Sequence, residues 1–140
     1  MHRLERSKIL EVIENYCRYI KNKNDLDKLA HLFAERVYWH VFSTGSGAWN
    51  EKHAETRAEV KQMYAYFHKN IQAMDVTYTN FIVDEVNNRL AFLVLVRGIN
   101  ADGTHFNMEN SVELQLNEDY QITRFLNWYG TAPDRIFWPK

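Results

Sequence analysis

The sequence predicts an α+β fold in which three N-terminal helices pack on one face of a curved antiparallel sheet. The main observation is the alternation of apolar and polar residues from Val76 to Tyr129, interrupted three times by residues that favour tight turns. The second is the helical spacing of apolar residues in three earlier segments. With 140 residues, 46% hydrophobic and 25% charged, the chain is expected to form one domain over residues 1–140.

Two helices are expected first. From Leu4 to about Asn22, apolar residues recur at the spacing of one helical face: Ile9, Val12, Ile13, Tyr16 and Ile20. Asn24 or Asp25 then caps a shorter helix with an apolar side made of Leu26, Leu29, Ala30 and Phe33.

A strand, a loop and a third helix follow. Residues 37–43 are rich in β-branched and aromatic side chains and predict a strand, but its two faces are too similar to decide which points inward. Residues 44–52 have loop composition and are the expected mobile flap. Thr56 and Glu59 form a capping-box pattern before a helix that carries Val60, Met63, Tyr64, Phe67 and Ile71.

The four strands after these helices are expected to form a meander. The dipeptides Asn87-Asn88, Asp102-Gly103 and Glu118-Asp119 predict two-residue loops, which close on the pairs Val86/Arg89, Ala101/Thr104 and Asn117/Tyr120. Because the loops fix the register, they also fix which side chains share a face. The face expected to meet the helices holds Val76, Tyr78, Asn80, Ile82, Ala91, Leu93, Leu95, Arg97, Phe106, Met108, Asn110, Val112, Leu114, Leu116, Thr123, Phe125, Asn127 and Tyr129.

The inward face predicted in this way contains a group of polar side chains. Buried polar groups without partners are costly, so such a group must either satisfy itself or line a cavity. The sequence therefore predicts a ligand-binding set made of Trp39, Tyr78, Asn80, Met108, Asn110, Asn127 and Tyr129. The plainer alternative is that Trp39, Met108 and Tyr129 are ordinary core residues, as regularly spaced aromatic residues usually are.

The order of helix, helix, strand, helix and four strands, with the run Asn-Asp-Leu-Asp-Lys-Leu-Ala-His-Leu-Phe-Ala at 24–34, resembles the SnoaL-like branch of the nuclear-transport-factor-like superfamily. The resemblance implies a cone with a central pocket and a homodimer. It also implies a small organic ligand, and we expect a cofactor-independent isomerase, dehydratase or cyclase acting on an apolar or aromatic substrate. A non-catalytic binding or dimeric assembly module of the same fold is the alternative.

The resemblance also supplies catalytic candidates. The positions of the tyrosine, base and protonated acid of ketosteroid isomerases resemble Cys17, Val41 and Val112, so none of these groups is retained. Tyr16 and His40 are one residue away from two of these positions and remain candidates. Arg97 is the third candidate, because a guanidinium on the inward face needs an anion, either a ligand or a structural partner such as Glu109.

Composition limits the partners and the compartment. A net charge of −1 and the absence of a long apolar run argue against nucleic acid or membrane as a partner. The single Cys17 excludes an internal disulfide, and the six histidines have no metal-ligand spacing, so we expect a cytoplasmic protein without metal or cofactor. Phe92, Val94, Val96, Leu126 and Trp128 are expected to form an apolar outer patch that mediates the homodimer, and the tail 131–140 to pack over an opening or onto a partner.

Overall fold

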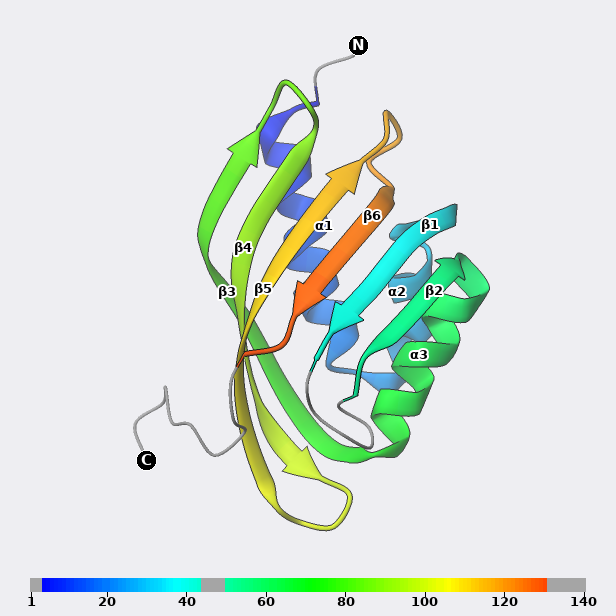
Figure 1. The fold of residues 1–140 in the computed structure, drawn as a ribbon, viewed down its shortest axis with the longest axis vertical. Helices are drawn as coiled ribbons and strands as arrows, with labels where there is room; N and C mark the ends of the chain where they lie inside the picture. Colours follow the sequence, from blue (N-terminus) through cyan, green and yellow to red (C-terminus); the bar gives the residue numbers. More distant parts are fainter. Residues whose placement is uncertain (1–3, 44–49, 131–140) are drawn as a thin grey trace.

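The computed structural model describes residues 4–43 and 50–130 of the chain, which form an α+β arrangement of three α-helices and one six-stranded sheet (Figure 1). The flap predicted at 44–52 and the tail at 131–140 lie wholly or mostly outside the described residues. Within the described part, no helix is both long and apolar enough to cross a membrane.

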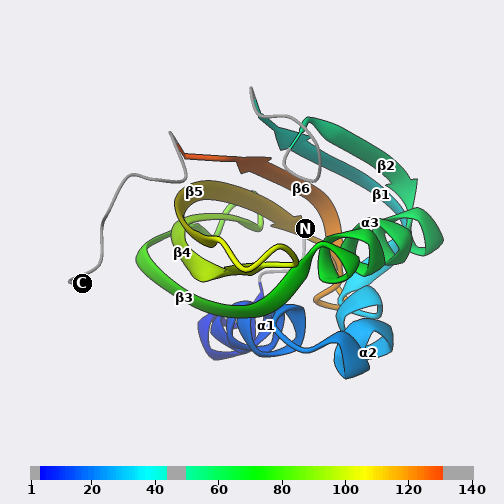
Figure 2. The same cartoon turned by 90° about the horizontal axis from the view of Figure 1, so that it is seen from below.

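The sheet has the strand order β2-β1-β6-β5-β4-β3. Its strands are β1 (Phe33–Phe42), β2 (Lys52–Thr56), β3 (Ile71–Asp84), β4 (Arg89–Asn100), β5 (His105–Leu116) and β6 (Ile122–Trp128). Neighbours are antiparallel except β1 and β6, which run parallel, so the predicted purely antiparallel sheet is wrong and the sheet is mixed. Figure 2 shows that the sheet is curved and open, with α1 and α2 on one side of it.

The helices begin and end close to the predicted positions. Helix α1 (Arg6–Ile20) buries Ile9, Val12, Ile13, Tyr16 and Cys17, as its apolar spacing predicts. A 3-10 turn η1 (Lys23–Asp25) precedes α2 (Leu26–Ala30), which is shorter than expected because Phe33 already begins β1. Helix α3 (Arg57–Lys69) starts with the predicted cap, in which the Glu59 backbone N–H donates to Thr56 Oγ1 over 3.2 Å.

The structure shows which face of β1 points inward, which its sequence pattern left undecided. Val37, Trp39 and Val41 are buried on the helix side, while His40 lies on the outer face with the other alternate residues. Strand β2 pairs with β1 over residues that had been expected to belong partly to a loop. Its short, polar sequence gives a weak strand signal because β2 is an edge strand with only Ala54 buried.

The inward face of β4 is the opposite of the predicted one. The hairpin between β4 and β5 is closed by Asn100 and Thr104 around a three-residue loop, in which Gly103 has φ of 89°. The extra loop residue moves the register by one, so the buried residues of β4 are Leu90, Phe92, Val94 and Val96. The expectation that Arg97 faces the helices is therefore wrong, since Arg97 is exposed on the outer face opposite Asn107. For the same reason Phe92, Val94 and Val96 do not belong to an outer patch.

A bulge in β3 changes a second part of the predicted face. The pairing with β4 shifts between Thr79 and Ile82, and Asn80 within it has a positive φ of 54°. Val76 is buried on the helix side, but Asn80 is exposed and Ile82 is 68% exposed. The prediction that Asn80 and Ile82 point inward is wrong because the bulge reverses the alternation beyond Thr79.

Candidate functional site

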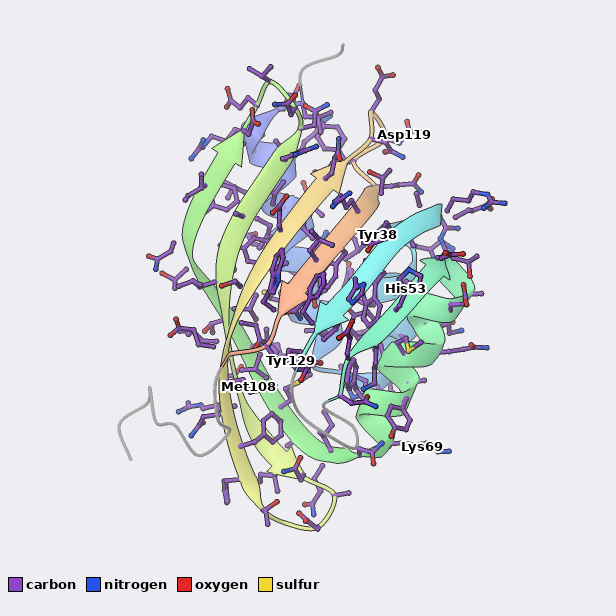
Figure 3. All side chains as sticks on the ribbon, in the orientation of Figure 1. Tyr38, His53, Lys69, Met108, Asp119 and Tyr129 are labelled. Atoms are coloured by element: carbon purple, nitrogen blue, oxygen red, sulfur yellow. The ribbon has the colours of Figure 1, made fainter. Side chains whose placement is uncertain are left out.

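A small cavity lies between α1, α3 and the inner face of the sheet. Its volume is about 40 Å³. Most of its wall is hydrocarbon, and its lining consists of Tyr16, Ile20, Trp39, Val41, Tyr64, Phe67, His68, Ile71, Met74, Val94, Val96, Met108, Asn110, Asn127 and Tyr129. Figure 3 shows Met108 and Tyr129 close to each other, where β5 passes the end of β6.

Three aromatic side chains from three elements form a hydrogen-bond chain in this wall. Trp39 Nε1 of β1 donates to Tyr64 Oη of α3 over 3.2 Å, and Tyr64 Oη is 3.2 Å from Tyr16 Oη of α1. The three side chains have three hydrogens, one indole N–H and two phenol O–H, available for these two hydrogen bonds. One phenol hydrogen is therefore left over within the described part of the chain, whichever tyrosine is the donor in the second bond.

Both phenols stay neutral under ordinary conditions. Burial raises the pKa of Tyr16 well above its usual value, and the bond to Tyr64 acts in the same direction. Burial likewise raises the pKa of Tyr64, although its bonds to Tyr16 and Trp39 act against this. A buried, neutral phenol is a hydrogen-bond donor and not a base at physiological pH.

Two asparagines form the polar part of the sheet wall. Asn110 is 2% exposed, and its Oδ1 accepts from the backbone N–H of Gly130 over 3.1 Å, which holds the chain after β6 against β5. Asn127 is 8% exposed, and its buried Oδ1 has no hydrogen-bond partner among residues 4–43 and 50–130. An orphaned amide oxygen beside a cavity marks a place where a polar ligand group or water gains a bond.

His68 also lines the cavity and is not among the site residues that the sequence proposed. Its Nε2 lies 2.7 Å from the carbonyl oxygen of Ile20, the last residue of α1. Burial lowers the pKa of His68, with a smaller opposing effect from the Ile20 carbonyl. The signal that could have placed it is its spacing, because His68 follows the inward Tyr64 by four residues of one helix.

Four predicted site residues lie elsewhere. Arg97 and Asn80 are exposed as described above. Tyr78 lines a separate surface groove between α1 and β3, beside Cys17. His40 lies on the outer face, where its Nε2 is 2.6 Å from Glu51 Oε2 and its ring stacks on Phe42 at 4.0 Å. The outer position of His40 is also evident from Tyr38 and His53, which Figure 3 labels on the same face of β1 and β2.

The chemistry of the lining is therefore restricted. The lining residues that the structure describes include no carboxylate, and the described chain holds no cluster of His, Cys, Asp or Glu suited to a metal ion. What they provide is a hydroxyl donor from the Tyr16–Tyr64 pair, the hydroxyl of Tyr129, two amides and one neutral imidazole. Six residues that the sequence proposed share this wall: Tyr16, Trp39, Met108, Asn110, Asn127 and Tyr129.

Solved structures with the same fold include proteins of several kinds. A protein from Catenulispora acidiphila with a ketosteroid isomerase-like fold, in complex with trimethylamine, is 16% identical with a TM-score of 0.74, covering 88% of both chains. SalBIII, an epoxide hydrolase/cyclase-like enzyme in pyran ring formation in salinomycin, is 14% identical with a TM-score of 0.70, covering 92% of this chain and 95% of its own. An LEH-like epoxide hydrolase of M. tuberculosis is 8% identical with a TM-score of 0.68, covering 88% and 83%.

These identities establish a shared fold and not a shared activity. Among curated proteins, none matches this sequence. The profile of the SnoaL-like domain matches residues 13–125, which include every residue that lines the cavity except Tyr129 and Asn127. The chain belongs to the SnoaL-like domain family.

Proposed function

We propose that the protein binds a small, mostly apolar organic molecule in this cavity and hydrogen-bonds one oxygen of the ligand. The observation that carries the proposal is the Trp39–Tyr64–Tyr16 chain, which leaves one phenol hydrogen over inside a hydrocarbon wall. A ligand oxygen that accepts this hydrogen, such as a carbonyl or ether oxygen, gains a bond in a site of low polarity, where hydrogen bonds are stronger than in water. Asn110, Asn127 and Tyr129 supply further polar contacts on the sheet side.

The size of the cavity restricts the ligand. A volume of about 40 Å³ suits a compact group, and a larger ligand requires side chains of the wall to move. Met74 and Met108 in the wall are suited to this, because methionine is unbranched and adapts its shape easily. Small rings bearing one oxygen are therefore the first molecules to test.

The reaction class proposed for this site is cofactor-independent isomerase, dehydratase or cyclase chemistry. Similarity in fold to an epoxide hydrolase/cyclase-like enzyme supports this class only in general terms. The second candidate is a binding module without turnover, and the observation in its favour is the lack of a carboxylate among the described lining residues. The two differ in whether a bound molecule is converted.

The binding proposal is tested with two molecules of nearly the same shape. Cyclohexanone carries the oxygen, whereas methylenecyclohexane replaces that oxygen with a CH₂ group. We expect NMR titrations of the labelled protein to give at least tenfold tighter binding of cyclohexanone, which corresponds to about 1.4 kcal/mol. The double variant Tyr16→Phe with Tyr64→Phe removes both phenol hydrogens and is expected to abolish this preference, whereas Tyr16→Phe alone keeps the Tyr64 O–H as a donor and should retain it. Equal binding of both molecules to the wild type would refute the proposal.

We also propose a homodimer through the outer face of the sheet. The support is an outer aromatic cluster made of Tyr38, Phe42 and Trp128, of which Tyr38 is 43% and Trp128 38% exposed. The rings of Phe42 and Trp128 stack at 5.0 Å across β1 and β6, which makes a flat apolar surface of the kind that meets a second chain. Light scattering at micromolar concentration should give twice the chain mass, and Trp128→Glu should give the monomer; a monomeric wild type would exclude the dimer.

A further inference from the structure

The position of His68 and the tautomer of its neutral ring give the cavity a basic group. It is the penultimate residue of α3, one helical turn after Tyr64, so its ring and the phenol chain belong to the same wall. Four residues of an α-helix rise about 6 Å, which is the span of a small ring. The tyrosine hydroxyls and the imidazole can therefore contact different parts of one small molecule.

The bond between His68 and α1 fixes the tautomer of the imidazole. A carbonyl oxygen only accepts hydrogen bonds, so Nε2, 2.7 Å from the Ile20 oxygen, must carry a hydrogen. In the neutral ring the lone pair is then on Nδ1, which no group in the described part of the chain engages. Burial and the nearby charge of Lys23 both lower the pKa of His68, which favours this neutral form at pH 7.

A purely structural role for His68 explains the hydrogen bond of Nε2 but not the position of Nδ1. Ile20 belongs to the last turn of α1, where backbone carbonyls lack partners within the helix, and His68 satisfies one of them. That role uses Nε2 and places no requirement on Nδ1. It also does not require a basic side chain, because a glutamine amide could donate the same bond.

From this geometry we infer that His68 Nδ1 is the proton acceptor of the site and that the substrate is a small ketone or aldehyde with a C–H next to its carbonyl group. The inference rests on the proposed function, since the phenol hydrogen holds the carbonyl oxygen. Nδ1 takes the proton as the C–H bond breaks, and the electron pair moves to the oxygen, which becomes an enolate bonded to the phenol. The proton returns from Nδ1 to the same carbon or to a conjugated one, so no other reactant is consumed.

Burial disfavours the charged state of His68 that this step creates, and the end of α1 partly offsets that effect. When Nδ1 gains a proton, the imidazolium keeps its Nε2–H bond to the Ile20 carbonyl. The C-terminal end of α1 carries partial negative charge, which stabilises a cation there. The charge of Lys23 acts in the opposite direction and favours return of the proton.

Deuterium exchange into cyclohexanone in D₂O, followed by NMR, tests the inference. We expect the wild type to accelerate exchange at the carbons next to the carbonyl above the buffer rate. His68→Gln retains a donor for the Ile20 carbonyl but has no basic nitrogen, so it should lose at least tenfold of this acceleration while binding cyclohexanone within threefold of wild type. The matched control His105→Gln removes an exposed imidazole at the start of β5 and should keep the wild-type rate.

The outcomes separate the two proposals. A wild type that binds cyclohexanone but exchanges it at the buffer rate, or a His68→Gln variant with undiminished exchange, overturns the role of His68 and leaves the binding proposal intact. A wild type that does not bind cyclohexanone overturns both. The pH profile of the wild type is an independent readout that needs no variant: catalysed exchange should fall as His68 is protonated below pH 6.5, and a rate without this decrease contradicts the inference.

Discussion

Removing the Tyr64 hydroxyl should cost more stability than removing the Tyr16 hydroxyl. Trp39 is 0% exposed, and the structure shows its Nε1–H bonded to Tyr64 Oη. Tyr64→Phe leaves that buried N–H without an acceptor, which costs roughly 1–3 kcal/mol, and also removes the bond to Tyr16. Tyr16→Phe removes one bond between neutral groups, worth about 0.5–1.5 kcal/mol, and leaves the indole satisfied.

Urea unfolding followed by tryptophan fluorescence measures the difference. With an m value of about 2 kcal/mol per molar urea, a loss of about 2 kcal/mol in Tyr64→Phe lowers the midpoint by about 1 M. Tyr16→Phe should lower it by about half as much, with m unchanged in both variants. The double variant Tyr16→Phe with Tyr64→Phe should cost little more than Tyr64→Phe alone, because the two hydroxyls share one bond. A Tyr64→Phe variant as stable as Tyr16→Phe would refute the hydrogen-bond chain from Trp39 through Tyr64 to Tyr16.

Three further predictions concern the sheet and the histidine. Gly98→Ala should destabilise the protein by about 1–3 kcal/mol, measured by urea unfolding, because a Cβ there would overlap the carbonyl oxygen of Ala73; a neutral effect would contradict the register of β3 and β4. Asn110→Ala should cost roughly 1–3 kcal/mol, because it leaves the Gly130 N–H without its acceptor, and a thermal melt equal to that of the wild type would count against this bond. The pKa of His68 is lower in the folded chain than its usual 6.5, so between the folded-state pKa and 6.5 the imidazole takes up a proton when the chain unfolds. The stabilisation from the neutral ring is therefore present above about pH 6.5 and is lost as pH falls. His68→Gln should flatten this slope between pH 7.5 and 5 in urea unfolding, and an unchanged slope would contradict it.

The sequence predicted the helices and the family well because these depend on local signals. The apolar spacing of α1 and the Thr56–Glu59 cap of α3 are confirmed in the structure. The alternating pattern of β5 also identified its inward side correctly, since its even residues are buried from Phe106 to Leu116. The predicted inward face therefore included Met108, Asn110 and Asn127, which lie on the cavity.

The errors arose where one residue decides the face of a whole strand. Asp102-Gly103 was expected to form a two-residue loop, but Gly103 is the last residue of a three-residue loop, so Arg97 moved to the outer face. Nearly every residue of β4 up to Val96 is apolar, and its own pattern could not correct the register. The bulge at Asn80 depends on pairing with β4 and has no clear local signal.

His68 was missed for a different reason. Its value as a site residue comes from the Ile20 carbonyl, 48 residues away in sequence, and from the cavity wall that α1 and the sheet complete. A sequence pattern shows which face of α3 carries Tyr64 and His68. The tautomer of the imidazole, however, follows only from the three-dimensional contact.

A crystal structure of the protein with cyclohexanone bound tests the central claim most directly. The account predicts the ring inside the cavity, with its oxygen within about 2.5–3.0 Å of the hydroxyl of Tyr16 or Tyr64. A ring bound instead in the groove between α1 and β3, or an oxygen directed away from both phenols, would contradict it.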